Sequence, residues 1–370
     1  MRACSCSLLA LCLLLAVHAL LAAPTHAAPR PPQFTWAQYG GGGWDFPHSI
    51  AHDSRGNVLY AGAILSAQKC TFGDITTPLP PGWGSIFVVK YQPDGTAEWV
   101  RVFGGSMCQE VGGLAVDAQD NIIVAGSYFR DMAFDEIHLT TPGGGSDSDA
   151  FLAKLDSTGR VVWARRAGGL SWDEGQGVSV DPDGFIYLCG EFSGDSDFGG
   201  VSLTSVGSRD VFLARYSPSG KPLWVKQDGG TNNDWACDAE ADAHHGCFLA
   251  SSLGLAYYDA AGNREWQRGV GVYFAPAWGL WNWGRLAVSP DRCCTVVGGV
   301  GAEAQSNIAV AKVNYKGDTL WHRSFGGDGL DWARGVAIDR SGNSVVAARL
   351  TGAADIGTGV LSPTGGQDML

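Results

Sequence analysis

Eight of the fourteen tryptophans stand where an indole ring could recognise a ligand. An exposed indole offers a flat apolar face to a sugar ring, and a nearby carboxylate can accept hydrogen bonds from sugar hydroxyls. All eight fall in segments that we expect to be long connections between strands: Trp44, Trp83, Trp172, Trp235, Trp278, Trp281, Trp283 and Trp332. Four carboxylates occupy equivalent positions in these connections: Asp45, Asp173, Asp234 and Asp331. We predict a ligand-binding surface made of these residues.

A packing role is the alternative for the tryptophans that recur at the same place. Trp44, Trp172, Trp235 and Trp332 repeat, so they could fill gaps between structural units, because large aromatic residues usually pack in cores. The segment 271–285 differs because it occurs once. It adds Tyr273, Phe274, Trp278, Trp281 and Trp283, which repeat packing does not require. Such a patch favours a contact surface.

The sequence predicts no catalytic, metal or cofactor site. The histidines are scattered, and no His-Glu-x-x-His, Gly-x-Ser-x-Gly or Cys-x-x-Cys element is present. Asp-x-x-Gly-Asn strings begin at Asp53 and Asp339, but they lack the alternating carboxylates that calcium prefers. We expect these aspartates to cap tight turns.

A repeat sets the elements that must position the tryptophans. A second set of tryptophans recurs after short turns, and a glycine follows each of them five residues later. In four copies an aspartate follows that glycine after thirteen residues: Asp117, Asp181, Asp242 and Asp339. The recurring tryptophans are Trp36, Trp99, Trp163, Trp224, Trp266 and Trp321. Fixed spacing of this kind indicates a repeat architecture.

Each copy has the pattern of two β-hairpins. In the third copy, residues 177–190 read as a strand, an Asp-Pro-Asp-Gly turn and a strand. Residues 210–227 read as a strand, a Ser-Pro-Ser-Gly turn and a strand that carries Trp224. The pattern predicts an all-β protein, a six-bladed β-propeller of four-stranded antiparallel blades. The tight turns then lie on one face, and the long connections with the eight tryptophans lie on the other.

Three strings of the repeat resemble the SBBP family, a β-propeller repeat of exported bacterial proteins. They are GGLAVDAQDNIIVAG, SGDSDFGGVSLTS with its Phe-Gly element, and DAFLAKLDSTGRVVWARRAGG. The resemblance covers the chain from Trp36 to Leu370, although the fourth copy lacks the Phe-Gly element. It implies a propeller and export, and it implies no single activity.

The two ends of the repeat region predict how the propeller closes. Residues 34–41 read as a fourth strand without its first three, so we expect this N-terminal strand to close the last blade. The last copy has its first two strands and only the beginning of a third, at Asp368. We therefore expect the last blade to be truncated.

The N-terminus has the pattern of a secretory signal peptide, which we place at residues 1–27. Arg2 precedes the apolar run 8–23, and small residues follow. Residues 28–370 then form the propeller domain of six repeats. No later stretch is long enough to span a membrane, and the net charge of −12 argues against nucleic acid as a partner. We expect a secreted protein, extracellular or at the cell surface, with the periplasm as the alternative.

Seven cysteines remain after the signal peptide, an odd number. Cys70 and Cys108 fall in adjoining long connections, so we predict a disulfide between them. Cys237 and Cys247 resemble a hairpin pair, but the turn places Cys237 opposite a residue near Ser251. Cys189 replaces a small strand residue and is expected to be a buried free thiol.

These patterns favour a noncatalytic binding or scaffold module whose partner is a carbohydrate or an extracellular protein. A secreted enzyme with a site over the central channel (a lyase, a hydrolase or a quinoprotein-like oxidoreductase) is one alternative. A structural repeat segment of a larger surface protein is the other.

Overall fold

The computed structural model describes residues 36–38, 40–143, 147–274, 284–302, 305–327, 329, 331–339, 341–356, 360–361 and 368–369. The chain divides into two compact units, Met1–Ala37 and Gln38–Leu370. The predicted signal peptide lies outside the described residues. Within the described part of the chain, no helix is long and apolar enough to cross a membrane.

The described residues of Gln38–Leu370 form antiparallel strands and no helix, which confirms the predicted all-β class. Each of the first five copies builds a four-stranded antiparallel sheet from two hairpins, because tight turns join its first strand to its second and its third to its fourth. The first three sheets comprise β2 (Trp44–His52), β3 (Val58–Leu65), β6 (Gly84–Tyr91) and β7 (Ala97–Gly104); β8 (Gln109–Val116), β9 (Ile122–Phe129), β12 (Ser148–Leu155) and β13 (Val161–Gly169); and β14 (Glu174–Val180), β15 (Ile186–Phe192), β18 (Asp210–Tyr216) and β19 (Pro222–Asp228). The next two comprise β20 (Ala236–Ala241), β21 (Cys247–Ser251), β22 (Gly254–Tyr258) and β23 (Arg264–Arg268); and β24 (Arg285–Val288), β25 (Cys293–Ala302), β26 (Gln305–Asn314) and β27 (Thr319–Phe325). The last copy contributes β28 (Trp332–Ile338), β29 (Ser344–Leu350) and β32 (Asp368–Met369), and β32 pairs with β29 where a third strand is expected.

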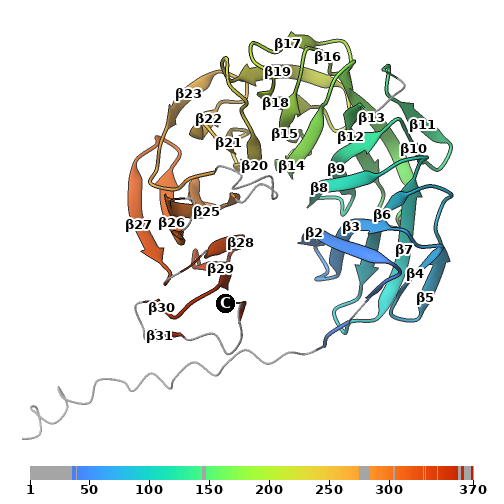
Figure 1. The fold of residues 1–370 in the computed structure, drawn as a ribbon, viewed down its shortest axis with the longest axis horizontal. Helices are drawn as coiled ribbons and strands as arrows, with labels where there is room; N and C mark the ends of the chain where they lie inside the picture. The colour runs from blue at the N-terminus through green and yellow to red at the C-terminus, as the bar shows by residue number, and fades with distance from the viewer. Residues whose placement is uncertain are drawn as a thin grey trace, which may run out of the picture. The chain divides into compact units, whose positions relative to one another are not determined.

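Successive sheets follow one another around a common centre, as Figure 1 shows. The first strand of each sheet lies beside the first strand of the next, so these strands form an innermost layer. Hydrophobic clusters lie between neighbouring sheets; one contains Phe103 of the first sheet and Phe151 of the second. Strands β6 and β12 are buried along their whole length because both of their faces are covered.

The Phe-Gly element, which is replaced by Phe134-Asp135 in the second copy, belongs to a small hairpin that packs on its own sheet and reaches the preceding one. In the second copy the hairpin is β10 (Asp131–Phe134) and β11 (Ile137–Thr140), and β10 pairs with the outer strand β7 of the first copy. Phe134 is fully buried, with its ring centroid 4.9 Å from that of Phe103 and 5.3 Å from that of Phe151. In the third copy β16 (Asp195–Asp197) and β17 (Ser202–Thr204) repeat this arrangement on β13. The element therefore joins neighbouring sheets.

The segment before the first sheet also pairs with a small hairpin. Strand β1 (Gly40–Gly41) pairs with β4 (Lys69–Phe72), which forms the small hairpin of the first copy with β5 (Ile75–Pro78). Gly41 follows Trp36 by five residues, as Gly104 follows Trp99, and Gly104 pairs with the hairpin of the second copy. β1 therefore pairs with the small hairpin of the first copy in the same way as the outer strands β7 and β13 pair with the small hairpins of the second and third copies.

The recurring tryptophan connects each of the first four sheets to the next one. The indole Nε1 of Trp99 donates to the carbonyl of Ser157 at 3.4 Å, and that of Trp224 donates to the carbonyl of Ala260 at 3.0 Å. Both acceptors lie in the tight turn between the third and fourth strands of the following copy. A turn glycine packs against each indole, as Gly159 does against Trp99. This hydrogen bond explains why a tryptophan recurs at a fixed position in the repeat.

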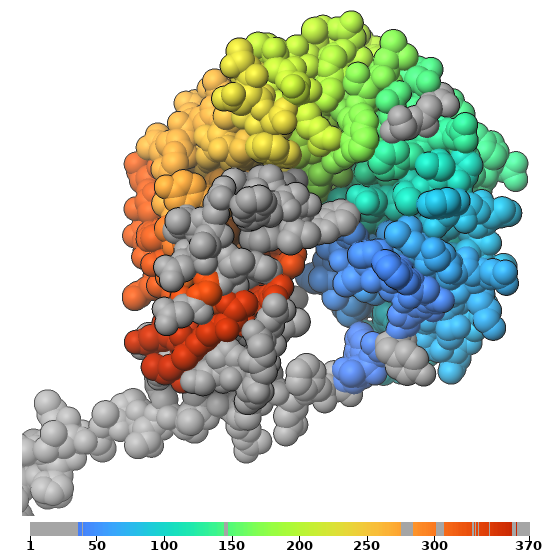
Figure 2. All heavy atoms as spheres, in the orientation of Figure 1, coloured from blue at the N-terminus to red at the C-terminus, as the bar shows by residue number. Residues whose placement is uncertain are grey.

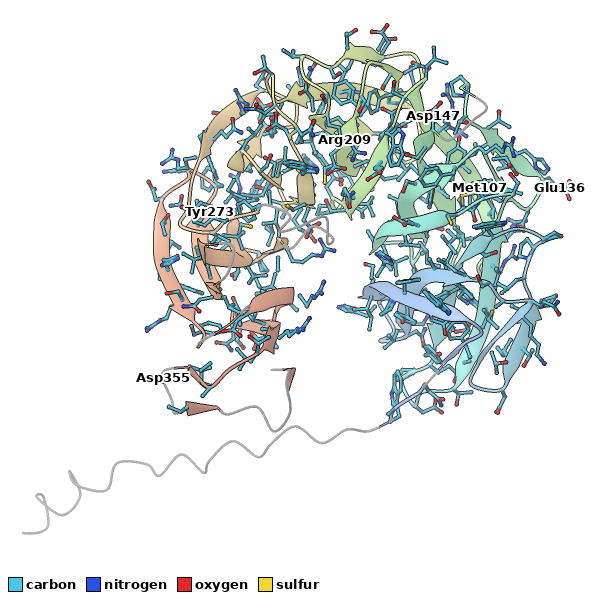
Figure 3. The ribbon with its side chains drawn as sticks, in the orientation of Figure 1. Met107, Glu136, Asp147, Arg209, Tyr273 and Asp355 are labelled. Atoms are coloured by element: carbon cyan, nitrogen blue, oxygen red, sulfur yellow. The ribbon has the colours of Figure 1, made fainter. Side chains whose placement is uncertain are left out.

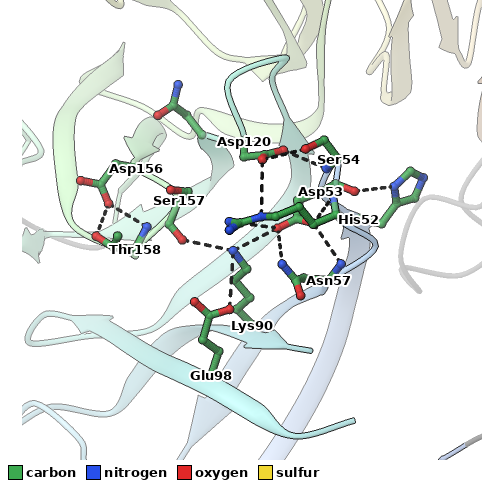
Figure 4. Close-up of polar contacts among 12 residues, drawn as sticks. His52, Asp53, Ser54, Asn57, Lys90, Glu98, Asp120, Asp156, Ser157 and Thr158 are labelled. Atoms are coloured by element: carbon green, nitrogen blue, oxygen red, sulfur yellow. Dashed lines mark hydrogen bonds and ion pairs between the residues drawn. The ribbon is translucent and has the colours of Figure 1, made fainter. Parts of the chain in front are cut away.

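The tight-turn aspartates cap their turns, as predicted from the sequence. The Asp53 carboxylate accepts hydrogen bonds from the backbone N–H groups of Arg55 and Asn57, each at 2.9 Å, and from the Asn57 side chain at 2.7 Å (Figure 4). Asp339 makes the same bonds with Ser341 and Asn343. Burial opposes ionisation of Asp53, but the hydrogen bonds from Asn57 and Lys90 lower its pKa to about 2.

A buried cation accompanies several of these turns. Lys90 is 1% exposed, and its Nζ lies 3.0 Å from Oδ2 of Asp53 and 3.3 Å from the carbonyl of Ser157 in the next copy (Figure 4). Lys154 with Asp117 at 2.7 Å repeats the ion pair one sheet later. These pairs fix the tight-turn face, which lies opposite the long connections.

Candidate ligand-binding site at the channel mouth

The innermost strands surround a pocket of about 890 Å³ at their N-terminal ends. The long connections lead into these ends, so the pocket opens on the face where the sequence predicted a ligand surface. In Figure 2 an opening borders the blue residues of the first sheet. We call it the channel-mouth pocket; its charged, polar and aromatic lining residues are Phe46, His48, Glu110, Ser127, Glu174, Gln176, Glu191, Arg209, Trp235, Arg285 and Arg334.

A β-bulge at the same place in five innermost strands shapes the pocket. The pairing of each of these strands with the second strand of its sheet skips one residue: His48, Gly112, Gln176, Cys237 and Arg334. A bulge leaves the extra residue unpaired and re-aims its side chain. Four of the five bulged residues line the pocket, while the fifth is a buried cysteine. The bulges therefore supply the His48, Gln176 and Arg334 side chains and the Gly112 backbone to the pocket.

Carboxylates from the second and third copies form one wall, which we call the acidic wall: Glu110, Glu174 and Glu191. Gln176 donates from Nε2 to Glu191 at 3.1 Å, and the Arg209 guanidinium lies 3.8 Å from Oε2 of Glu174. Burial, assisted by the neighbouring Glu174 charge, raises the pKa of Glu110 to about 7. Burial also raises the pKa of Glu174, although Arg209 opposes that effect. The wall thus offers several hydrogen-bond acceptors and one carboxyl that titrates near neutral pH.

Arginines from the last two sheets form the basic wall: Arg285 and Arg334 at the pocket, with Arg349 beside them. The guanidinium of Arg285 donates to the backbone carbonyls of Cys237 and Gly284, both at 3.1 Å. Burial and the neighbouring charges of Arg349 and Arg285 lower the pKa of Arg334. Burial and then Arg285 also lower the pKa of His48 to about 4, so this imidazole is neutral at physiological pH.

Aromatic side chains border the acidic wall. Trp235 is half-buried and lines the pocket. The Arg209 guanidinium lies over the ring of Trp172, 5.3 Å from its centroid, and that ring packs edge-on against Phe129 at 5.6 Å. Figure 3 labels Arg209 on the third sheet. Trp172 therefore packs between sheets while keeping 42% of its surface exposed, which fits both sequence interpretations.

Two tryptophans of the first sheet are the most exposed of the predicted set. Trp44 is 73% exposed and Trp83 is 72% exposed. Trp44 pairs with Leu65 at the end of β3, and the next residue, Ser66, donates its N–H to the Trp83 carbonyl at 3.2 Å. Both indoles thus flank one strand end on the long-connection face. Tyr273, 66% exposed, is also predicted and lies next to the fifth sheet, with its backbone paired to Gly299.

The predicted loop aspartates hold the long connections in place. Asp173 is 1% exposed and accepts from the Gly169 N–H at 2.7 Å and the Ser196 hydroxyl at 2.6 Å. Asp234 accepts from the N–H of a loop glycine at 2.9 Å, and the buried Asp331 does so at 2.8 Å. Asp45 accepts from the Gly42 N–H at 3.1 Å and is exposed. These bonds explain why an aspartate recurs, and a ligand contact at these positions stays a prediction.

Several predicted residues have side chains that the structure does not describe. Trp278, Trp281 and Trp283 lie outside the described residues. Trp332 begins β28, and its side chain lies outside the description as well. Their predicted role in binding stays a prediction.

The predicted Cys70–Cys108 disulfide is wrong, because both thiols are free in the structure. Cys70 is buried in β4, where nearby Asp45 adds to burial in raising its pKa to about 11. Cys108 precedes β8, and burial and then Glu110 raise its thiol pKa. Cys70 thus lies within β4, whereas Cys108 lies at the start of β8 in the next copy. Cys189 is buried and free, as expected.

The register of the Cys237 strand is as predicted. Ala236 pairs with Ser251 and Asp238 with Ala250, so Cys237 stands in the bulge between them, while Cys247 pairs with Ala241. The two thiols are therefore not cross-strand partners.

Sequence reasoning missed the charged lining residues. Glu110 and Glu174 directly follow the loop Gln109 and Asp173, and Arg334 stands three residues after Asp331. Other copies carry Phe46 and Trp235 at the first offset and Gly112 and Cys237 at the second, so the repeat itself gave no signal of charge at these places.

Replacing Glu110 with glutamine should change how stability depends on pH. A raised folded-state pKa means that the Glu110 contribution to stability is present below the ordinary value of 4.5 and is lost as pH rises through about 7. Glu110→Gln should therefore raise the free energy of unfolding by about 2 kcal/mol near pH 8 and leave it nearly unchanged near pH 4. Urea denaturation across this range measures the difference. Glu136→Gln, at an exposed hairpin turn, is the control, and parallel profiles for Glu110→Gln and the wild-type chain would contradict the burial of Glu110.

Comparison with family models finds a match to SBBP, described as a beta-propeller repeat, over residues 162–198. An uncharacterized WD repeat-containing protein L264 of Acanthamoeba polyphaga mimivirus is 27% identical over 156 residues, 39% of this chain and 11% of that protein. The regulatory protein FlaEY of Caulobacter vibrioides is 26% identical over 162 residues, 42% of this chain and 17% of that protein. The aligned parts of the chain thus span less than a fifth of either relative.

Two solved structures match this chain at low sequence identity. A protein of unknown function from Bacteroides caccae matches 78% of this chain and 92% of its own, with 10% identity and a TM-score of 0.41. A puromycin hydrolase matches 83% of this chain and 50% of its own, with 13% identity and a TM-score of 0.43.

Proposed function

The chain carries an SBBP β-propeller repeat, and we propose that it is an exported, noncatalytic binding module that takes a saccharide on its long-connection face. Export rests on the signal-peptide pattern of residues 1–27. The observation that carries the binding proposal is the coincidence on one face of the channel-mouth pocket with the exposed indoles of Trp44 and Trp83.

The architecture proposed for this module is a six-bladed propeller that the N-terminal segment closes. The support is the pairing of β1 with β4, which repeats the pairing of β7 with β10 and of β13 with β16. On this proposal β1 belongs to the outer strand of the last blade. Joining the ends of the chain would protect strand edges that otherwise invite aggregation.

A saccharide fits the chemistry of this face. Indole faces stack on the C–H surface of sugar rings, and carboxylates accept hydroxyl hydrogen bonds. The acidic wall supplies acceptors, and Trp235 supplies a flat ring at the same pocket. The pocket volume of about 890 Å³ lies in the range of small-molecule sites.

The pocket also favours a second candidate, an enzyme that cleaves the saccharide it binds. A carboxyl whose pKa lies near 7 can act as a general acid at neutral pH, and Glu110 beside Glu174 has that property. This candidate requires turnover, which the noncatalytic proposal excludes. Recovery of the bound saccharide intact would support the noncatalytic module, and recovery of shortened products would support the enzyme.

Removing both exposed indoles should abolish most saccharide binding. A glycan array probed with the wild-type chain should show selective signals, and the double variant Trp44→Ala/Trp83→Ala should bind the same glycans at least about tenfold more weakly, because two apolar contact faces are lost. The matched control is Leu223→Ala, which removes an exposed apolar side chain from the outer strand β19. Uniform background across neutral and acidic glycans would refute the carbohydrate proposal.

A further inference from the structure

We propose that the acidic wall of the channel-mouth pocket recognises a saccharide with free amino groups, and that the ammonium group of a hexosamine unit binds at Glu110 and Ser127. The inference rests on the proposed function and deepens it by naming the ligand class. It depends on the pairing of these two side chains, on the charges around Glu110, and on the hydrogen-bonding groups beside it.

Glu110 and Ser127 are cross-strand partners at the pocket. Glu110 of β8 pairs with Ser127 of β9, and paired residues of an antiparallel ladder place their side chains on the same face of the sheet. Both residues line the pocket. Ser127 is only 6% exposed, and within the described part of the chain its hydroxyl has no hydrogen-bond partner. Buried hydroxyls usually have a partner, so this one indicates that a ligand completes its hydrogen bonding.

The surroundings of Glu110 favour a cation. Burial and then the neighbouring Glu174 charge raise the pKa of Glu110 to about 7, and no cation or hydrogen bond among the described residues opposes this shift. Arg209 lies 3.8 Å from Glu174 and serves that carboxylate. His48 on β2, which packs against β8, is neutral at physiological pH, and the Cys108 thiol keeps its proton because its pKa is raised. Glu110 is therefore a carboxyl at the pocket without a cation of its own.

The other charged groups of the pocket act elsewhere. The Arg285 charge acts on the buried Asp238 carboxyl, whose pKa it lowers against the larger effect of burial. Arg334 belongs to the last sheet, and burial lowers its pKa. Glu191 accepts two hydrogen bonds within the protein, at 3.0 and 3.1 Å. None of these groups is among those that shift the pKa of Glu110. An incoming cation would therefore find its counter-charge at Glu110.

The neighbouring groups favour an amino sugar over a metal ion or a basic peptide. Among the described residues, no three histidine, cysteine or carboxylate side chains are grouped so that they could hold a metal ion. A hexosamine carries its ammonium group on a ring with several hydroxyls, so it can serve Glu110 and the Ser127 hydroxyl together. A lysine side chain carries the ammonium group on an apolar stem and brings no hydroxyl. Trp235 adds a flat ring to the same pocket, which suits a sugar ring.

Calorimetric titration of the mature chain with three oligosaccharides of equal length tests this inference. Hexaglucosamine should bind at about pH 6, where its amino groups are mostly charged, while hexa-N-acetylglucosamine and maltohexaose should bind at least about tenfold more weakly, since neither carries an ammonium group. Binding of hexaglucosamine should weaken as salt rises. Glu110→Gln should lose about tenfold in affinity, because glutamine keeps the shape but not the charge. Ser127→Ala should lose less, since a neutral hydrogen bond is weaker than a charge-assisted one.

Proton release supplies a readout that a merely structural role of Glu110 would not give. At about pH 6 the free Glu110 carboxyl is mostly protonated because its pKa is about 7, and its ionised form is the one that pairs with an ammonium group. Binding of hexaglucosamine should therefore release up to about one proton per chain, which titrations in two buffers of different ionisation enthalpy measure. Glu110→Gln should abolish this release. Glu136→Gln, the matched control at an exposed hairpin turn, should retain it.

Retained thermal melting of Glu110→Gln and Ser127→Ala shows that the fold of both variants is intact. Equal affinity for hexaglucosamine and its N-acetylated form, or no effect of Glu110→Gln on affinity and proton release, would overturn the inference while leaving saccharide binding in place. Tighter binding of hexalysine than of hexaglucosamine would overturn it in favour of a basic peptide. A glycan array without any signal would instead refute the proposed function.

Discussion

Gly126→Ala should destabilise the fold by about 3 kcal/mol or more, because the added methyl group has no space. Gly126 lies in β9 opposite the bulge of β8, and a Cβ there would overlap the carbonyl oxygen of Glu110 and approach the Phe151 ring to 2.9 Å. The Glu110 carbonyl belongs to the backbone, which cannot rotate away as a flexible side chain can. The bulge of β8 must therefore shift to make room for the methyl group. The variant should therefore disturb the acidic wall as well as stability.

The midpoint of urea denaturation, measured by tryptophan fluorescence, checks this expectation. Gly230→Ala is the matched control, because a Cβ at that glycine would meet open space. Gly62 and Gly190 hold the same place in the first and third sheets, against the carbonyls of Phe46 and Glu174, so their alanine variants should behave like Gly126→Ala. A midpoint for Gly126→Ala equal to that of the control would contradict the bulge geometry on which the pocket depends.

Lys90→Met should lower the free energy of unfolding by about 3–5 kcal/mol, the usual cost of removing one partner from a buried ion pair. Lys90 and Asp53 are 1% and 2% exposed, and their charged groups are 3.0 Å apart. Methionine keeps a similar length and apolar stem, but it leaves the Asp53 carboxylate with only the exposed Arg55 guanidinium, 3.9 Å away, as a cation. The carbonyl of Ser157 in the next sheet also loses a donor.

Chemical denaturation of Lys90→Met beside Lys221→Met, which replaces an exposed lysine at a tight turn, measures this effect. The double variant Asp53→Asn/Lys90→Met should recover part of the loss, since it removes the uncompensated charge. If Lys90→Met proves no less stable than Lys221→Met, the buried network between the first two sheets is wrong.

The sheets were predictable from sequence because the features that build them are local. A few adjacent residues mark a tight turn, as Asp53 and Gly56 mark the first one, and the strand lengths follow from the turns. The repeat places the same kind of turn pattern in each copy along the chain, so the strands can be recognised several times over. For the same reason the register around Cys237 could be predicted from the position of one turn.

The pocket was not predictable in the same way because it depends on bulges and on contacts between copies. A strand alternates its side chains, so plain alternation gives no sign that His48 and Arg334 are displaced from the pairing register. The failed Cys70–Cys108 prediction has a similar cause. The topology places Cys70 and Cys108 in neighbouring connections on one face, which suggested a disulfide. Where the Cys70 side chain points, however, depends on the pairing of β4 with β1 and β5.

The predicted aromatic surface shows what a sequence pattern can and cannot distinguish. Trp44 and Trp172 hold equivalent places, yet Trp44 is 73% exposed while Trp172 packs against Phe129 and Arg209. Their surroundings come from different neighbouring residues, which the repeat does not fix. The recurrence therefore placed Trp44 and Trp172 at the same position of the repeat without saying which indoles are available to a partner.

Hydrogen–deuterium exchange with the most strongly bound array glycan tests the central claim that the partner sits over the channel mouth. Binding should slow amide exchange in the innermost-strand segments 46–48, 110–112 and 174–176 and in the segments that contain Arg285 and Arg334, because these residues line the pocket. Exchange in the tight turn 53–57 on the opposite face should not change. Protection confined to the tight turns, with the innermost strands unaffected, would contradict the account.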